Sequence, residues 1–295
     1  MRPLAWKKII VPLGIPIVVV LAFFGFVRYS FSAGRAAVEQ SRYADAERYF
    51  GRIVRLAPWS GQYHAWFGYA LMKQQKWDAA LAHYTVAIRR GYAYSSVWQN
   101  RGYVYRAKAI AAGIQNEQDA QRQYAELSIA DYEKAVENNP RSAQSYFYLG
   151  NVHYYHLQEY EKALGFYQKA LELEPTNWRY WTGVAAGYAG IGDYERALGY
   201  LERSLDIKPT PQAYNSIGWI YGYRLNDYPK AIEAFERAIA LDPAYANVYD
   251  NLGGIYFRLG ENEKALDAYN TYLRLAPEGE WAEFVRSQIQ KLQSQ

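Results

Sequence analysis

The sequence contains no cysteine. Disulfides, thiolate zinc sites, iron–sulfur clusters and cysteine nucleophiles are therefore excluded. A basic block is also missing, because the 33 Lys and Arg residues and the 29 Asp and Glu residues are interspersed and leave a net charge of +4. A surface that follows a phosphate backbone needs clustered basic side chains, so we expect no nucleic-acid partner.

Signatures of catalysis and of metal binding are missing as well. His153 and His156 are three residues apart on one expected helix, but no third or fourth ligand is evident near them, so we interpret both as structural. Gly187, Gly190 and Gly192 form a glycine-rich phrase that no strand precedes, which argues against a phosphate loop. We therefore predict that the protein is not an enzyme and that it needs no cofactor, metal or small-molecule substrate.

A long uncharged run near the N-terminus is the strongest hydrophobic feature of the chain. It covers residues 9–27 and reads IIVPLGIPIVVVLAFFGFV. As a helix it would measure about 28 Å, close to the ~30 Å hydrocarbon core of a bilayer. We predict a transmembrane anchor over residues 9–28 after a short basic tail, 1–8.

A cleaved signal peptide is the alternative to the anchor. Basic residues precede the apolar run, and Ser30-Phe31-Ser32 is a site of the small-x-small type. The apolar run is, however, longer than the roughly 7–15 residues of such signals. A buried core helix is disfavoured because the run is apolar on every face.

The basic residues on the two sides of the run predict its orientation. Arg2, Lys7 and Lys8 precede it, and Arg28, Arg35 and Arg42 follow it. With the free amine added, the positive-inside rule slightly favours a cytoplasmic N-terminus. We expect a single-pass membrane protein whose remaining chain is extracytoplasmic.

A regular period dominates the rest of the sequence. Four evenly spaced prolines mark the period, namely Pro175, Pro209, Pro243 and Pro277. An alanine stands twelve residues before each proline, at Ala163, Ala197, Ala231 and Ala265. A small residue comes twelve or thirteen residues before each alanine, at Gly150, Ala185, Gly218 and Gly253.

This pattern resembles the tetratricopeptide repeat, which has a period of about 34 residues and reads W-x2-L-G-x2-Y, then A-x3-F, then P. The resemblance implies two antiparallel helices in each repeat, stacked into a right-handed α-α superhelix. We expect the two small residues, such as Gly218 and Ala231, to let the two backbones approach closely. The proline would end the second helix of each repeat.

The same register continues upstream and predicts seven repeats over residues 29–277. An amphipathic helix within residues 278–295 would cap the last open apolar face. The predicted fold class is thus an all-α solenoid of about seven helix pairs with a capping helix and an N-terminal transmembrane helix.

One repeat is longer than the others. Its second helix ends at Pro140, and Ser128 replaces the alanine. Since the additional length is close to four helical turns, we expect both helices to be lengthened by about two turns around Gly113. The extra part, 107–123, is interpreted either as a harmless insertion or as a docking spur for a partner or the membrane.

The first helices of such repeats line a concave face on which partners usually lie. The residues expected on this face are aromatic, amide or acidic: Gln62, Tyr69, Gln99, Tyr103, Phe147, Asn151, Tyr154, Asn215, Trp219, Asn247 and Asp250. Alternatively, some of these rings pack between neighbouring repeats. Cations that could clamp an acidic C-terminus are isolated, at Lys73, Arg106, Arg179 and Arg258, so we do not transfer that specificity from the family.

The resemblance implies a binding function. We predict a membrane-anchored scaffold or adaptor that holds a protein or peptide in its concave groove and assembles or recruits a membrane-associated complex. The alternative is a non-catalytic regulatory subunit of a membrane or envelope enzyme, such as a protease or a glycan synthase.

Overall fold

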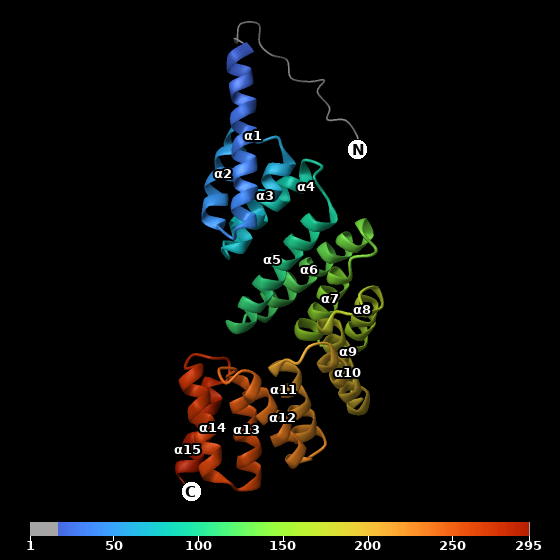
Figure 1. The fold of residues 1–295 in the computed structure, drawn as a ribbon, viewed down its shortest axis with the longest axis vertical. Coiled ribbons are helices and arrows are strands. Elements are labelled where there is room, and N and C mark those ends of the chain that lie inside the picture. Colours follow the sequence, from blue (N-terminus) through green and yellow to red (C-terminus); the bar gives the residue numbers. More distant parts are fainter. Residues whose placement is uncertain (1–16, 295) are drawn as a thin grey trace. The chain divides into compact units, whose positions relative to one another are not determined.

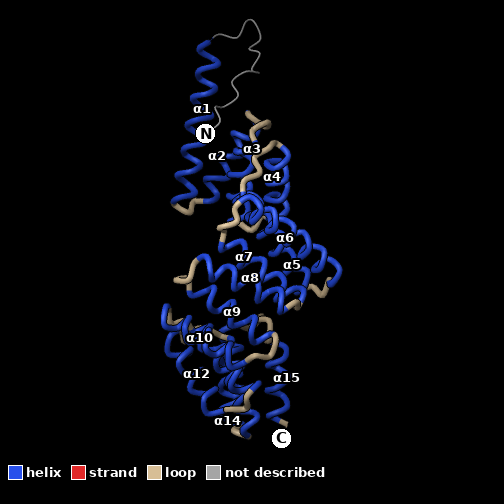
Figure 2. The backbone as a smooth tube through the Cα atoms, turned by 90° about the vertical axis from the view of Figure 1, so that its right-hand side faces the viewer, coloured by secondary structure: helices blue, strands red, loops and turns tan. Residues whose placement is uncertain are grey.

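The computed structural model describes residues 17–294 (Figure 1). The predicted tail, 1–8, and the first part of the predicted membrane span, 9–16, lie outside the described residues. Helices form all of the regular secondary structure between residues 17 and 294, and no strand occurs there (Figure 2). The predicted all-α fold is therefore confirmed. The chain divides into two compact units, Met1–Pro140 and Arg141–Gln295, and each is described by itself.

The first unit contains three helix pairs (Figure 1). Its helices are α1 (Ile17–Glu39), α2 (Tyr43–Leu56), α3 (Gly61–Lys73), α4 (Trp77–Arg89), α5 (Ser95–Ile114) and α6 (Gln118–Asn138). Each pair consists of two consecutive helices that pack side by side.

The second unit contains four further pairs and a last helix. Its helices are α7 (Ala143–Val152) with the π-helical segment η2 (His153–Leu157), α8 (Tyr160–Leu173), α9 (Trp178–Gly190), α10 (Tyr194–Ile207), α11 (Pro211–Trp219) with the π-helical segment η3 (Ile220–Arg224), α12 (Tyr228–Leu241), α13 (Asn247–Leu259), α14 (Asn262–Leu275) and α15 (Ala282–Gln293). Val285 and Leu292 of α15 are buried against Tyr269 and Tyr272 of α14, so α15 covers the apolar face that the last pair leaves open.

Helix α1 runs through the predicted boundary between anchor and first repeat, at residues 28 and 29. Its C-terminal part belongs to the core, because Val27 and Ala37 are buried with Phe50 of α2. Its earlier part exposes apolar side chains, including 65% of Leu21. We find no helix in the described part of the chain, residues 17–294, with both the length and the apolar character to cross a membrane.

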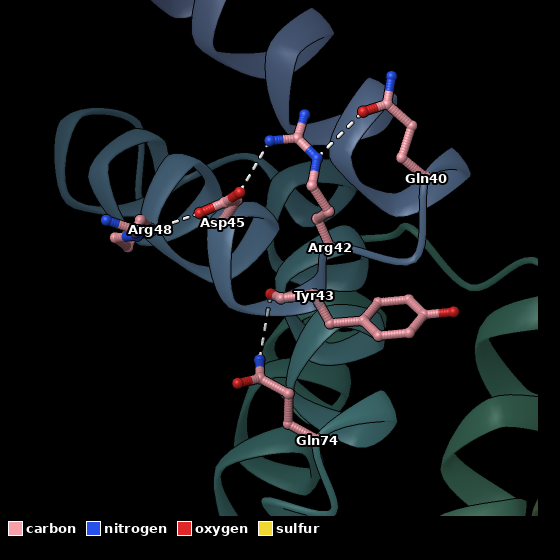
Figure 3. Close-up of polar contacts among 6 residues, drawn as sticks. All are labelled: Gln40, Arg42, Tyr43, Asp45, Arg48 and Gln74. Atoms are coloured by element: carbon pink, nitrogen blue, oxygen red, sulfur yellow. Dashed lines mark hydrogen bonds and ion pairs between the residues drawn. The ribbon is translucent and has the colours of Figure 1, made fainter.

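Polar contacts fix the turn between α1 and α2 (Figure 3). Arg42 donates from Nε to Oε1 of Gln40 at 3.0 Å and from Nη1 to Oδ2 of Asp45 at 2.9 Å. Gln74, which follows α3, donates from Nε2 to the carbonyl oxygen of Tyr43 at 3.2 Å. This bond ties the end of α3 to the start of α2, so hydrogen bonding as well as packing connects the first two repeats.

A small residue on the first helix faces a large side chain on the second helix in the helix pairs. A Cβ added to the glycine would meet an aromatic ring at 3.2 Å or less in six of them: Gly34 with Phe50, Gly68 with Tyr84, Gly102 with Tyr132, Gly150 with Tyr167, Gly218 with Phe235, and Gly253 with Tyr269. The pair α9–α10 has Ala185 and Leu201 at the same positions, both buried in one cluster.

The predicted close contact between Gly218 and Ala231 is wrong. The atoms nearest to a Cβ on Gly218 belong to the ring of Phe235, the closest at 2.5 Å. Ala231 instead lies beneath Gly222, where an added Cβ would be 3.1 Å from its methyl carbon. The glycine therefore makes room for a ring, and the alanine makes room for the next turn of the first helix.

The two π-helical segments explain an irregularity of the repeat spacing. The small residue and the alanine are one residue farther apart in the pairs that contain η2 and η3 than in α9–α10 and α13–α14. In η3, the amide of Leu225 donates to the carbonyl oxygen of Ile220, five residues back, at 3.1 Å. A π turn thus accommodates the additional residue without breaking the helix.

The long repeat forms the pair α5–α6. These helices have 20 and 21 residues, whereas α3 and α4 have 13 each. Ser128, in place of the alanine, donates from its buried hydroxyl to the carbonyl oxygen of Gly102 at 2.8 Å, so the substitution is accommodated by a hydrogen bond. Ile110 and Ile114 near the end of α5 are exposed, Ile114 by 79%.

Candidate functional site

Two neighbouring first helices of the second unit, α11 with η3 and α13, carry the densest group of predicted site residues. We call this group the α11–α13 face. It comprises the exposed Asn247 and six half-buried residues: Asn215, Trp219, Tyr223, Asp250, Asn251 and Gly254. The structure brings together Asn215, Trp219, Asn247 and Asp250 of the predicted set on this face. Tyr223, Asn251 and Gly254 are additions that the sequence analysis missed.

Hydrogen bonds hold the amides of this face in place. Asn251 donates from Nδ2 to Oδ1 of Asn215 at 3.0 Å, which links α13 to α11. The same nitrogen is 3.1 Å from the carbonyl oxygen of Asn247, one turn earlier on α13. Tyr223 donates its hydroxyl proton to the carbonyl oxygen of Asn251 at 3.0 Å. The geometry of the face is therefore fixed before any partner arrives.

Two arginines lie over the aromatic rings of the face. The guanidinium of Arg224 is 4.7 Å from the centre of the Trp219 ring, and that of Arg258 is 4.7 Å from the centre of the Tyr223 ring. The Trp219 and Tyr223 rings are stacked, with centroids 6.4 Å apart. Gly254 permits this arrangement, because an added Cβ would collide with the Tyr223 hydroxyl.

Asp250 is the acidic group of the α11–α13 face. Burial raises the pKa of its carboxyl group to about 6. Burial also raises the pKa of the Tyr223 hydroxyl, and the nearby Asp250 carboxylate adds to that effect. Asp250 forms no ion pair with any residue in the described range 17–294. Its carboxylate is thus desolvated without a cation beside it.

The predicted residues of α7 contact side chains of their own repeat and of the following repeat. Phe147 lies between Tyr167 and Tyr180, with ring centroids at 5.6 and 5.3 Å. Asn151 accepts a hydrogen bond from the Tyr167 hydroxyl at 2.9 Å. Phe147 therefore fits the alternative in which some of the predicted rings pack between neighbouring repeats.

Tyr154 connects η2 electrostatically to the α11–α13 face. Burial raises the pKa of its hydroxyl to about 12, and the positive charge of Arg224 partly opposes that rise. Its ring is half-buried against Tyr160, with centroids 5.2 Å apart. Tyr154 is therefore a half-buried residue of the predicted set whose hydroxyl feels the charge of Arg224.

The remaining predicted site residues lie in the first unit. Gln62 is exposed on α3, whereas three others on α3 and α5 are half-buried: Tyr69, Gln99 and Tyr103. No contact between these residues and the α11–α13 face is inferred, because the two units are described separately.

The four cations that the sequence analysis singled out as isolated all lie over aromatic rings. Lys73 is 5.4 Å from the Tyr69 ring, Arg106 is 5.3 Å from the Tyr103 ring, Arg179 is 5.4 Å from the Trp178 ring, and Arg258 lies over Tyr223. Cation–π contacts therefore explain these positions without an acidic ligand.

His153, one of the two histidines that the sequence analysis considered as ligands, makes contacts within its own repeat. His153 contacts Oε2 of Glu159 through Nδ1 at 2.6 Å and stacks on Phe166. No group of three or more potential ligands occurs among residues 17–294. The contacts of His153 with Glu159 and Phe166 fit the interpretation of this residue as structural.

A histidine pair that the sequence analysis missed joins α3 and α4. Nδ1 of His64 and Nδ1 of His83 are 2.8 Å apart, and Nε2 of His64 is 3.1 Å from the carbonyl oxygen of Pro58. A carbonyl oxygen only accepts, so Nε2 of His64 carries the proton and its Nδ1 accepts from Nδ1 of His83. His64 is thus neutral in the hydrogen-bonded pair.

This pair predicts a loss of stability in acid. Burial lowers the pKa of His83 to about 4, and the neighbouring His64 adds to the effect. In the unfolded chain the same histidine has a pKa near 6.5, so it takes up a proton at a higher pH than in the folded chain. The free energy of unfolding is therefore highest above pH ~6.5 and decreases as the pH falls towards 4. The loss is at most about 3 kcal/mol.

Titration of His83 by NMR and urea unfolding between pH 7.5 and 4 will check this prediction. The variant His83→Phe should lose less stability over that range than the wild type. The difference between the two chains removes the contributions of other titrating groups to the pH dependence. One of these is Asp250, whose raised pKa stabilises the fold as the pH falls. A measured His83 pKa near 6.5 would contradict the prediction.

Comparison with known sequences supports the repeat assignment. Sequence models described as tetratricopeptide repeat match residues 31–96 and 116–177, residues 182–212, and residues 219–290. An Hsp70-Hsp90 organizing protein of Triticum aestivum is 32% identical over 111 residues, which are 37% of this chain and 16% of the relative. This chain thus spans less than a fifth of the length of that relative.

Comparison with solved structures supports the fold. A tetratricopeptide repeat protein from Parabacteroides merdae superposes with a TM-score of 0.71 at 18% identity, covering 92% of this chain and 100% of that one. The pilF protein of Pseudomonas aeruginosa superposes with a TM-score of 0.58 at 14% identity, covering 77% and 97% of the two chains. Proteins of this repeat type are generally scaffolds for protein interaction. The helix pairs, their spacing and these matches show that this chain is built of tetratricopeptide repeats and adopts their all-α solenoid fold.

Proposed function

We propose that this protein is a non-catalytic scaffold that binds a polypeptide partner on the α11–α13 face and is held at a membrane by residues 9–28. The observation that carries the binding proposal is the fixed group of amides and rings on that face. Asn215 and Asn251 are oriented by the hydrogen bond between them. Their remaining donors and acceptors can pair with the backbone of an extended or helical partner.

The aromatic side chains favour a protein as the partner. Trp219 is half-buried, and Arg224 covers one face of its ring. A Trp in such a position gives a large contact area with little loss of side-chain entropy, and buried Trp residues are often interaction hot spots worth about 2 kcal/mol or more. Partner binding would complete its burial.

Loss of two half-buried aromatic side chains, Trp219 on the face and Tyr154 on η2, should abolish partner binding. Combining Trp219→Ala with Tyr154→Ala removes two aromatic contacts, and we expect the partner to be lost from the protein purified in mild detergent. Circular dichroism should show unchanged helicity. Trp59→Ala is the matched control, because Trp59 is 59% exposed outside this face, and Glu202→Ala is a second control. Both controls should retain the partner.

The same experiment tests the spur of α5–α6. Ile110→Asp with Ile114→Asp changes its exposed apolar surface and leaves the helices intact. If this variant loses the partner and the Trp219 variant keeps it, the spur is the binding surface and the proposal for the α11–α13 face is wrong. Mass spectrometry of the bound chains will distinguish an assembly scaffold from a regulatory subunit of an enzyme.

Two features support the membrane proposal. Residues 9–27 carry no charge, and the start of α1 exposes Leu21, Phe24 and Phe26. Cleavage at Ser30-Phe31-Ser32 would remove Val27 and Phe31 from the core around Phe50, which disfavours the signal-peptide alternative. We propose a cytoplasmic N-terminus and extracytoplasmic repeats, on the basis of the flanking charges.

Two shortened chains test the anchor and the role of α1 together. The full-length protein should resist carbonate extraction, whereas a chain beginning at Phe26 should be recovered in the soluble fraction with the helicity of the repeats. A chain beginning at Ser32 should melt at a lower temperature, because it lacks Val27 and Phe31. Extraction of the full-length protein by carbonate would refute the anchor.

A further inference from the structure

Asp250 is a charged residue at a position of the α11–α13 face where the other repeats have uncharged side chains. It stands three residues before the small residue Gly253 on the first helix of its repeat. The equivalent positions of the other repeats hold uncharged residues, namely Phe31, Ala65, Gln99, Phe147, Thr182 and Asn215. Packing of the repeat therefore does not depend on a carboxylate there.

The surroundings of Asp250 leave its carboxylate without a counter-ion. The two arginines beside the face, Arg224 and Arg258, lie over the Trp219 and Tyr223 rings, and neither forms an ion pair with Asp250 within residues 17–294. The Tyr223 hydroxyl donates its proton to the backbone of Asn251 instead. The Asp250 carboxylate acts on the hydroxyls of Tyr223 and Tyr269 through its charge, which raises the pKa of both. An ionised carboxylate only accepts hydrogen bonds, so it remains available to a donor from a bound partner.

The position of Asp250 in the first turn of α13 does not by itself explain a half-buried carboxylate. A carboxylate is favoured there by the helix dipole, but that contribution is available at an exposed position too. Asp250 is half-buried, and burial opposes its ionisation. Desolvated charges without a partner are characteristic of functional sites.

We propose that Asp250 binds a lysine or arginine side chain of the polypeptide that occupies the α11–α13 face, and that it selects partners with a basic residue at that point. This inference rests on the proposed function. The cation would donate one or two charge-assisted hydrogen bonds to the carboxylate. The rings of Trp219 and Tyr223 and the amide of Asn215 would contact the residues on either side of it.

Selection from a display library of random twelve-residue peptides, with the full-length protein in detergent micelles, tests the proposal. The wild type should enrich peptides that carry Lys or Arg at one fixed position. Asp250→Asn should lose the preference at that position alone. Asp267→Asn is the matched control, because Asp267 lies on α14, outside the α11–α13 face, and it should behave like the wild type.

One selected peptide then gives a quantitative test. Replacing its basic residue by citrulline, or by norleucine for lysine, removes the charge and keeps the length. We expect the wild type to bind the neutral peptide roughly tenfold or more weakly, and Asp250→Asn to bind both peptides equally. Selected peptides without a fixed basic residue, or an equal effect of the replacement in both proteins, would overturn the inference.

Trp219→Ala separates a failure of this inference from a failure of the proposed function. If Trp219→Ala loses the selected peptides and Asp250→Asn keeps the preference for Lys or Arg, the face binds polypeptides and only the role of Asp250 is refuted. If Trp219→Ala binds the peptides like the wild type, or if the wild type enriches no peptide, the proposed function itself is refuted.

Discussion

Gly218→Ala should destabilise the α11–α12 pair by about 1–3 kcal/mol, and Gly218→Leu by more. The added Cβ would lie 2.5 Å from Cε1 of Phe235, well inside van der Waals contact. Phe235 is fully buried, and protein interiors are close-packed, so its ring can move only by displacing its neighbours. The loss is measured by urea unfolding and by faster hydrogen exchange in α11 and α12.

Gly199→Ala is the matched control for this prediction. Gly199 lies on α10, and an added Cβ would meet no atom within 4 Å. The same chemical change should therefore stabilise the protein there, by roughly 0.5–1 kcal/mol, because alanine has the higher helix propensity. The two Gly→Ala variants are thus predicted to have effects of opposite sign.

The natural repeat α9–α10 suggests how the loss can be reversed. It has Ala185 and Leu201 where α11–α12 has Gly218 and Phe235. Combining Gly218→Ala with Phe235→Leu should therefore recover much of the lost stability. Destabilisation of the double variant by the sum of both single changes would show that the two residues do not form the proposed contact.

The helix pairs and their order could be predicted from the sequence because the repeat period is set by local chemistry. A proline such as Pro175 cannot continue a preceding helix, and a glycine such as Gly218 permits a close approach in any register. The partner of the glycine was misassigned because the spacing gives only the distance along the chain. The ring of Phe235, one turn beyond Ala231, fills the space.

The π-helical segments could not be predicted from the sequence, although the additional residue in these repeats indicates that their first helices are irregular. An additional residue between Gly218 and Ala231 is compatible with a longer turn, a bulge or a π turn. The structure accommodates it within the first helix, which brings Tyr223 onto the α11–α13 face. Register counting with an ideal helical period therefore omitted Tyr223 from the candidate site.

The histidine pair shows what comparison between repeats adds. His64 and His83 are far apart in the sequence and belong to different helices, so neither stands out alone. The same two positions of α9–α10 hold Trp181 and Tyr200, whose rings are 5.6 Å apart. Aligning the repeats by their small residues would have placed the two imidazoles together.

Loss of one charge from the ion pair inside α5–α6 is the second change expected to have a large effect. Arg101 donates from Nε and Nη2 to the two carboxylate oxygens of Asp131, both at 2.7 Å. The side chains are 15% and 4% exposed. Arg101 also donates from Nη1 to Oγ1 of Thr85 at 3.1 Å, which ties α5 to α4. Asp131→Ala leaves the guanidinium without its counter-ion and should cost about 3–5 kcal/mol of unfolding free energy.

Removing both charges should cost less than removing one. In the double variant Arg101→Met with Asp131→Leu, no desolvated charge remains and apolar side chains of similar volume fill the site, so its stability should exceed that of Asp131→Ala. The matched control is the exposed pair Arg237–Glu233, with side chains 59% and 62% exposed. Glu233→Ala should cost no more than about 0.5 kcal/mol, because solvent screens that pair. Urea unfolding of the wild type, Asp131→Ala, the double variant and Glu233→Ala measures these differences. A double variant less stable than Asp131→Ala would contradict the prediction and mean that the ion pair itself stabilises α5–α6.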